Sequence, residues 1–253
     1  MEEEIRSEGV RLAAHLARPP GSSPASPRLG LVICHGFPAG PRGARSSGQT
    51  YPELADRVAA DAGWVVLTFN FRGAGGSGGD FSMGGWLADV RAAVDHLFAQ
   101  DGIEGVWICG ASTGGSLAIA AAAEDDRVRG VVTLAARADF DDWAAHPRRF
   151  LDHARSIGVI RSSRFPPDED AWARELAEIR PLELVSKLAP RPLLLIHGSD
   201  DELVPTTDAR LLADMHGDAE LRIITGAGHR LRHDPRAVAV LLGWLDREGD
   251  AAS

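Results

Sequence analysis

Apolar, β-branched runs alternate with amphipathic segments along most of the chain, and this alternation constrains the fold more than any other feature. The runs are "LGLVICH" (29–35), "WVVLTFNF" (64–71), "GVWICG" (105–110), "RGVVTLAA" (129–136), "RPLLLIHG" (191–198) and "AELRIIT" (219–225). Continuous apolar runs of this length are typical of strands buried on both faces of a parallel sheet. Helical patterns lie between them, at about 50–62, 85–99, 113–124, 206–215 and 234–247. The sequence therefore predicts βαβ units and an α/β fold with a mostly parallel, doubly wound sheet.

Two segments depart from the alternation. The opening "IRSEGVRLAAHLARP" favours an antiparallel β-hairpin that leads into the sheet, and the turn-rich "PPGSSPAS" (19–26) follows it. The long region 137–190 separates two predicted strands and carries several aromatic residues. We interpret it as a small helical cap, inserted at about 137–188, over the carboxyl ends of the strands, where open α/β sheets bind their ligands. The whole chain, 1–253, is expected to be a single domain with this insertion.

Composition excludes several partners. The formal net charge is −9, which argues against a nucleic-acid surface or a polybasic membrane anchor. The acidic start "MEEEIRSEGV" has no apolar signal core, and no apolar run reaches the ~18 residues of a membrane span. We therefore expect a cytoplasmic protein. Cys34 and Cys109 lie inside apolar runs and are expected to be free buried thiols, although neighbouring strands could bring them close. The histidines show no metal-ligand spacing.

A serine motif lies between a strand and a helix. Gly110-Ala-Ser112-Thr-Gly114 fits G-x-S-x-G, and an alanine-rich helical segment follows it. A nucleophile elbow needs this placement, because small neighbours let strand and helix pass closely at a sharp turn. A serine hydroxyl also needs a base and an orienting acid. Asp201 follows one buried run, and His229 lies in a glycine-rich loop after the next, so the chain order is Ser, Asp, His.

Four motifs in this order resemble one family. They are "HGFP" (35–38), "GASTGG" (110–115), "HGSDDELVP" (197–205) and "GAGH" (226–229). The chain is similar, over about residues 10–247, to α/β-hydrolase-fold serine hydrolases of the esterase and lipase-like type, near the dienelactone hydrolase and prolyl-oligopeptidase-like branches. The resemblance implies Ser112 as nucleophile, His229 as general base and Asp201 as the acid that orients it. It also implies an oxyanion hole built from the backbone N–H groups of Phe37 and Thr113.

Other residues compete for these roles. Asp200 adjoins Asp201, and Asp139, Asp141 and Asp142 follow an earlier strand, where some relatives carry the acid. His233 lies near His229. His35 and His197 flank glycines at strand ends, and we interpret them as structural residues that bond to the backbone.

The stretch "RGAGGSG" (72–78) also fits the dinucleotide pattern G-x-G-x-x-G. The helical pattern begins only near Trp86, too late for a pyrophosphate at its N-terminus, and the next strand does not end in an acidic residue. We therefore expect tight turns rather than nucleotide binding, with Arg72 anchoring the loop through carbonyl groups or contacting a substrate carboxylate.

These residues predict a cofactor-independent serine hydrolase that cleaves a carboxylic ester of a small to medium acyl substrate through an acyl-enzyme. A peptidase, thioesterase, lyase or acyltransferase using the same triad is the alternative, and a non-catalytic binding protein is a third. Trp143 and Phe150 of the cap, together with Phe165 and Trp172, suggest either an apolar acyl pocket or packing of the cap on the domain. The sequence does not indicate the oligomeric state.

Overall fold

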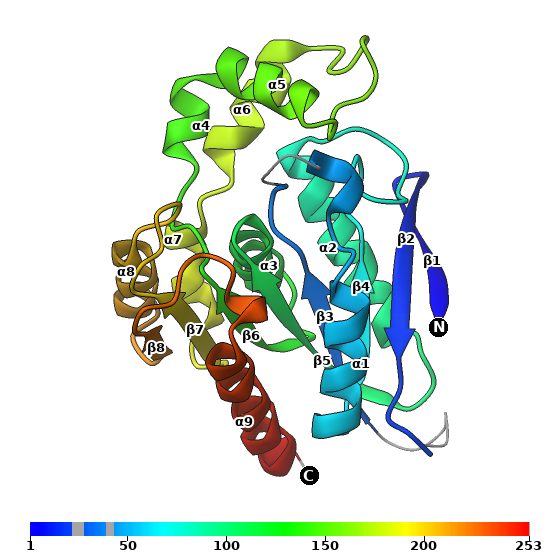
Figure 1. Ribbon diagram of the computed structural model, residues 1–253, viewed down its shortest axis with the longest axis vertical. Helices are drawn as coiled ribbons and strands as arrows, with labels where there is room; N and C mark the ends of the chain where they lie inside the picture. The colour runs from blue at the N-terminus through cyan, green and yellow to red at the C-terminus, as the bar shows by residue number, and fades with distance from the viewer. Residues whose placement is uncertain (22–27, 39–42, 253) are drawn as a thin grey trace.

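In the residues that the computed structural model describes, 1–21, 28–38 and 43–252, eight strands form one sheet (Figure 1). The strands are β1 (Glu2–Ser7), β2 (Val10–Ala17), β3 (Arg28–Cys34), β4 (Val65–Phe69), β5 (Ile103–Ala111), β6 (Val128–Leu134), β7 (Leu193–Gly198) and β8 (Glu220–Ile224). Their order across the sheet is β1-β2-β4-β3-β5-β6-β7-β8. β1 and β2 pair as an antiparallel hairpin, β2 is antiparallel to β4, and the remaining pairs are parallel. The predicted fold class is confirmed.

Helices cover both faces of this sheet. They are α1 (Tyr51–Ala62), α2 (Met83–Phe98), α3 (Thr113–Ala123), α4 (Asp141–Ala145), α5 (Pro147–Ser156), α6 (Glu169–Glu178), α7 (Pro181–Leu184), α8 (Thr206–His216) and α9 (Pro235–Ala252), with short 3-10 turns η1 (Gly43–Ser46), η2 (Val185–Leu188) and η3 (Leu231–His233). α1 and α9 pack on one face, and α2, α3 and α8 pack on the other. Strand side chains alternate between the two faces, which explains why the strand sequences are apolar throughout.

The two cysteines lie on opposite faces of the sheet. Cys34 on β3 is in register with Gly110 on β5, the residue after Cys109. Because successive side chains of a strand point to opposite faces, Cys109 faces away from Cys34. Both are buried and free, as expected.

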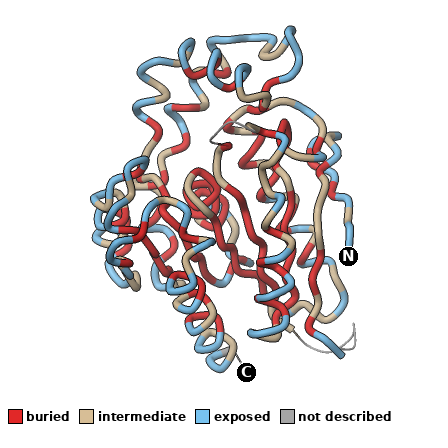
Figure 2. The backbone as a smooth tube through the Cα atoms, in the orientation of Figure 1, coloured by how far each residue is buried: buried red, intermediate tan, exposed pale blue. Residues whose placement is uncertain are grey.

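The segment between β6 and β7 forms the predicted cap. α4, α5 and α6 stand above the carboxyl ends of the parallel strands, at the top of Figure 1, and α7 and η2 lead back to β7. The cap is exposed over most of its outer surface, whereas the central strands are buried along their length (Figure 2). Across the described ranges no helix has the length and apolar character to cross a membrane. That the chain forms one domain stays a prediction.

Candidate active site

Ser112 occupies a strained turn between a strand and a helix. β5 ends at Ala111 and α3 begins at Thr113, and Ser112 between them has φ 51° and ψ −124°. A positive φ in a residue other than glycine is costly and marks positions where the surrounding structure imposes the conformation. The Ser112 N–H donates to the carbonyl oxygen of Leu134 on β6 at 2.8 Å. The turn is therefore held from the neighbouring strand, and Ser112 faces the carboxyl edge of the sheet.

The glycines around Ser112 permit close contact between backbones. A Cβ on Gly110 would collide with the carbonyl of Gly114, and one on Gly114 would collide with the carbonyl of His35. A Cβ on Gly36 would lie 3.0 Å from the Cβ of Ser112. The loop after β3, which carries Phe37, therefore lies directly beside Ser112.

Asp201 and His229 are joined by a hydrogen bond. The Nδ1 of His229 lies 2.8 Å from Oδ2 of Asp201. The other carboxylate oxygen, Oδ1, accepts hydrogen bonds from the N–H groups of Leu203 and Val204, each at 2.9 Å. The Asp201 carboxylate is fully buried, whereas the His229 ring is 20% exposed. The acid is thus held in place by backbone donors, and the histidine ring remains open to an incoming molecule.

Gly198 lets the loops that carry these two residues meet. It is the last residue of β7, three before Asp201, and a Cβ there would collide with the carbonyl of Ala227, two residues before His229. In the described chain, His229 makes no direct hydrogen bond to Ser112. The structure therefore joins two of the three predicted triad residues and places the third at the same sheet edge. Catalytic hydrogen bonds are often long in unliganded enzymes and shorten when substrate binds.

The predicted oxyanion donors lie on either side of Ser112, one on the loop after β3 and one at the start of α3. Phe37 follows β3, and Thr113 is the first residue of α3. Neither backbone N–H donates to another group of the described residues. The N-terminus of α3 adds a partial positive charge at this point. The described part of the site thus offers two backbone donors beside Ser112 that bind no acceptor within it.

The residues that competed for the acid and base roles have other partners. Asp200 accepts a hydrogen bond from Ser199 Oγ at 2.6 Å and is exposed. Asp141 and Asp142 form ion pairs with Arg180 and Arg137. Among the described residues, Asp139 and His233 form no hydrogen bond or ion pair with Asp201 or His229. Asp139 accepts from the N–H of Asp141, and His233 is exposed in η3.

His35 is bonded to the backbone on both sides of its ring. Its Nδ1 donates to the carbonyl of Gly36 at 2.8 Å, and its Nε2 accepts from the N–H of Phe71 at 3.1 Å. Complete burial, opposed by the bond to Gly36, lowers the pKa of His35 from 6.5 to about 4. The ring is therefore neutral at physiological pH, and it ties the Phe37 loop to the loop after β4, in agreement with the structural role expected for it.

His197 contacts the backbone, as expected, and also lies close to the carboxylate of Asp201. Its Nε2 lies 2.9 Å from the carbonyl of Val204, as expected for a backbone contact. The same nitrogen lies 3.4 Å from Oδ2 of Asp201. The i, i+4 spacing of His197 and Asp201 was visible in "HGSDD", but the short loop that turns the carboxylate back toward the strand was not.

Arg72 has different partners from those expected. Its guanidinium donates to Oδ1 of the buried Asp89 and to Oγ of Ser7, and its Nη2 lies 3.1 Å from the Glu8 carboxylate. The expectation that Arg72 anchors its loop through carbonyl groups is therefore wrong, because its donors reach carboxylates and a hydroxyl. The same contacts give no support to the expected substrate contact.

The backbone N–H groups of "RGAGGSG" are used within the protein. Gly73 donates to Gly78, Gly75 to Ala44, and Gly78 to Arg11. Gly73 and Gly75 also have positive φ values of 79° and 49°. The donors that a pyrophosphate would require are thus occupied, and the glycines serve tight turns as expected.

Aromatic rings join the cap to the Phe37 loop. The ring of Phe37 lies 5.2 Å from the ring of Trp143 and 5.2 Å from that of Phe150. Trp143 and Phe150 stack on each other at 4.1 Å. Trp172 donates from Nε1 to the carbonyl of Phe81 at 3.1 Å. These contacts support the packing interpretation, and they also place the half-buried Trp143 next to the predicted oxyanion loop.

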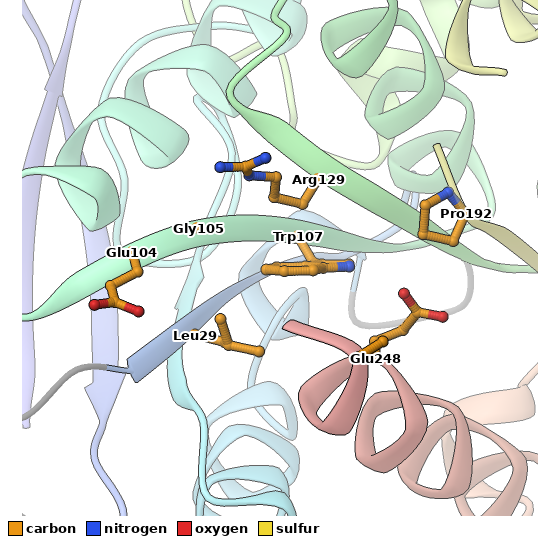
Figure 3. A pocket seen from close by; sticks show the side chains of 8 residues that line it. Leu29, Glu104, Gly105, Trp107, Arg129, Pro192 and Glu248 are labelled. Carbon is orange, nitrogen blue, oxygen red and sulfur yellow. The ribbon is translucent and has the colours of Figure 1, made fainter. Parts of the chain in front are cut away.

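A separate pocket of about 480 Å³ lies at the opposite edge of the sheet (Figure 3). Leu29, Glu104 and Arg129 line it near the amino ends of β3, β5 and β6, and Glu248 of α9 closes one side. Ligands of open α/β sheets bind at the carboxyl ends of the strands. The pocket therefore lies at the amino ends of the strands, whereas Ser112 and the candidate site lie at the carboxyl ends.

The topology and the Ser112 turn define an α/β-hydrolase-fold protein, and solved structures agree. Est1E from Butyrivibrio proteoclasticus, solved with ferulic acid, has a TM-score of 0.73 and 22% identity, covering 98% of this chain and 99% of that chain. Proline iminopeptidase from Mycobacterium smegmatis has a TM-score of 0.70 and 17% identity, covering 100% of both chains. At these identities the similarity shows the fold.

A match to a family model assigns the chain to one family within this fold. The model of the prolyl oligopeptidase family matches residues 54–250, so the chain belongs to that family. An uncharacterised protein of Mycobacterium tuberculosis is 29% identical over 222 residues, which cover 83% of this chain. The match covers 64% of that relative, so this chain spans less than two thirds of its length.

Proposed function

We propose that the protein is a serine hydrolase that cleaves carboxylic esters of small to medium acyl substrates. The observation that carries the proposal is the 2.8 Å bond between buried Asp201 and His229, on loops that end at the same sheet edge as Ser112. The strained conformation of Ser112 and its flanking glycines support the same reading. Family membership supports a hydrolase, and the ester bond is the finer part of the proposal.

The reaction proceeds in two acyl transfers. His229 accepts the proton of Ser112 Oγ as that oxygen attacks the substrate carbonyl, and the tetrahedral intermediate carries a negative oxygen. His229 then donates the proton to the leaving alkoxide, the carbon–oxygen bond breaks, and an alcohol leaves the acyl-enzyme. Water, deprotonated by His229, attacks the acyl-enzyme, and the proton returns to Ser112. Asp201 keeps Nδ1 of His229 protonated and stabilises the imidazolium that forms.

The backbone N–H groups of Phe37 and Thr113 are proposed to bind the oxyanion. Both lie beside Ser112 and have no acceptor among the described residues. Losing one such donor typically costs on the order of 3 kcal/mol of transition-state stabilisation. Since the Phe37 ring packs against Trp143 and Phe150, the acyl group bound there meets an aromatic wall. We therefore expect apolar acyl groups to be preferred.

Peptide hydrolysis is the second candidate, and the match to the prolyl oligopeptidase family favours it. The same residues would act on an amide, with His229 protonating the leaving nitrogen. The triad does not distinguish the two substrates, because the leaving group is selected by the cap and the pocket.

A fluorophosphonate probe tests the shared chemistry. The wild-type protein should be labelled, and Ser112→Ala should abolish labelling because the probe bonds to an activated serine oxygen. Ser116→Ala, one turn further along α3, is the matched control and should still be labelled. Absence of wild-type labelling, or labelling that survives Ser112→Ala, would refute the proposal.

The bond type is tested by comparing substrates. We expect p-nitrophenyl esters to be hydrolysed with a kcat/KM that rises with acyl length, above the values for aminoacyl amides and acyl-thioesters. Faster turnover of the amides would replace the ester proposal by the peptidase one.

A further inference from the structure

The segment of the cap that begins with α5 concentrates positive charge. Residues 147–164 include five arginines and a single acidic residue, Asp152, in a chain whose formal net charge is −9. The side chains of Arg148 and Arg149 are exposed, and among the described residues they form no hydrogen bond or ion pair. Unpaired charges of one sign produce a local potential that attracts ions of the other sign. This part of the cap therefore attracts anions, although the whole chain is acidic.

One side of α5 borders the predicted oxyanion loop. The ring of Phe37 lies 5.2 Å from that of Phe150 and 6.1 Å from that of His153. Phe150 is buried, whereas His153 is exposed. The ring of His153 therefore lies where the aromatic wall beside Phe37 meets the solvent.

Arg149 belongs to the same side of α5 as His153. The helix spans Pro147–Ser156, and residues four apart are neighbours on a helix surface, so Arg149 lies one turn before His153. The same helical repeat places Arg148 on the far side. The His153 side chain also has no hydrogen bond or ion pair within the described chain. Two unpaired basic side chains thus lie together at the edge of the contact with Phe37.

The nearby acidic side chains do not neutralise this edge. In the neighbouring helix α4, Asp141 is ion-paired with Arg180 and Asp142 with Arg137. Asp152 of α5 forms no ion pair with either basic side chain in the part of the chain that the structure describes. The donors at this edge therefore remain available to an anionic group of a bound molecule.

We propose that Arg149 and His153 bind a carboxylate at the far end of the acyl group, so that the preferred substrates are esters of apolar acids that carry a second, ionised carboxyl group. The acyl chain runs from the oxyanion donors along the Phe37 ring, and its carboxylate meets both side chains. A guanidinium matches the geometry of a carboxylate, and an imidazole donates an N–H even when neutral. Both residues touch the substrate away from the reacting atoms and determine specificity. This inference rests on the proposed function, because it names the acyl substrates of the same serine.

The test compares anionic and neutral esters of equal length. The substrates are the p-nitrophenyl half-esters of adipic, pimelic and suberic acid, each measured beside the matching methyl p-nitrophenyl diester. The three lengths place the carboxylate at different distances from the reacting carbonyl. We expect the wild type to hydrolyse at least one half-ester with a kcat/KM about fivefold above that of its neutral partner, the upper size of effect of an exposed ion pair. High salt should reduce this preference.

Arg149→Gln is the test variant, and Arg148→Gln is the matched control, because both are exposed arginines on different sides of α5. Arg149→Gln should lower the ratio of the two kcat/KM values about fivefold, and Arg149→Lys should keep most of the preference. His153→Leu should lower the ratio about threefold, since it removes one hydrogen-bond donor. Arg148→Gln should leave the ratio as in the wild type.

Three results would overturn the inference. They are a wild type that prefers none of the half-esters, a preference that survives Arg149→Gln, and equal losses in Arg148→Gln and Arg149→Gln, which would indicate attraction by the whole basic surface rather than binding at one edge. Failure of the proposed function would instead appear as a wild-type protein that the fluorophosphonate probe does not label.

Discussion

At the scale of single residues, the protonation state of His35, which lies beside the candidate site, affects the stability of the fold. The neutral ring donates from Nδ1 to Gly36 and accepts at Nε2 from Phe71, and only one neutral tautomer can do both. A proton on Nε2 would face the Phe71 N–H and remove that bond. Because the ring is buried, bulk solvent does not reach it to replace that bond.

This arrangement predicts a loss of stability in acid. The pKa of His35 is about 4 in the folded state and 6.5 in the unfolded chain, so the unfolded chain binds the extra proton between these values. Stability from the neutral ring is therefore complete above pH 6.5 and is lost as pH falls toward 4, by roughly 3 kcal/mol. The difference between the free energies of unfolding in urea at pH 7.5 and pH 4.5 measures this loss.

His35→Asn is the reference for that measurement, because it lacks the titrating group. The wild type should lose more unfolding free energy between the two pH values than the variant. An equal loss in both proteins would show that other groups cause the acid sensitivity.

At the scale of elements, the cap helices depend on docking for their stability. α5 and α6 have ten residues each, below the length at which isolated helices are stable in water. α5 buries Phe150, Leu151 and Ala154 against the domain. α6 is anchored by Glu175, which accepts a hydrogen bond from the N–H of Gly84 at the start of α2. The cap therefore keeps its structure through contacts with the residues around the Phe37 loop.

Phe150→Ala should consequently destabilise the protein by about 3–5 kcal/mol, because Phe150 is 6% exposed and contacts rings from both cap and domain. Phe98→Ala is the control. Phe98 is 37% exposed and lies outside the cap, so its loss should cost less. Chemical unfolding of the two variants compares them, and equal costs would contradict the docking role.

At the scale of the whole molecule, one buried ion pair ties the hairpin, the glycine loop and α2 together. Asp89 of α2 is fully buried and accepts from Nε, Nη2 and the backbone N–H of Arg72. Arg72 also reaches Ser7 and Glu8 at the end of β1. Removing the Asp89 charge leaves the largely buried Arg72 guanidinium with the exposed Glu8 as its one remaining charged partner among the described residues.

Asp89→Asn should therefore lower the free energy of unfolding by about 3–5 kcal/mol. The surface pair Arg57–Asp61 is the matched control, and Asp61→Asn should cost less than about 1 kcal/mol because both side chains are half exposed. The double variant Arg72→Met/Asp89→Leu should lose less free energy of unfolding than the sum of the losses in Arg72→Met alone and Asp89→Leu alone, because it leaves neither charge unpaired. A cost for Asp89→Asn no larger than that for Asp61→Asn would contradict this role.

Local patterns were sufficient for much of this molecule. The six apolar runs from 29 onward correspond to β3–β8, because burial on both faces of a sheet requires apolar side chains at consecutive positions. Gly110 and Gly198 lie within motifs that the sequence shows. The structure explains the need for glycine there, because another backbone segment lies where a Cβ would be. The location of Ser112, Asp201 and His229 at the carboxyl ends of the strands followed from the same runs, because each residue comes after a predicted strand.

Contacts between distant segments depended on tertiary packing. No local pattern showed that Arg72 would find Asp89, since the pairing arises from how α2 lies against the hairpin and the glycine loop. The proximity of His197 to Asp201 likewise depends on the path of the loop that follows β7. The local sequence determines which positions of a strand or helix are buried, because burial follows the pattern of apolar side chains. The partner of a buried charge is determined by which distant segments come into contact when the chain folds.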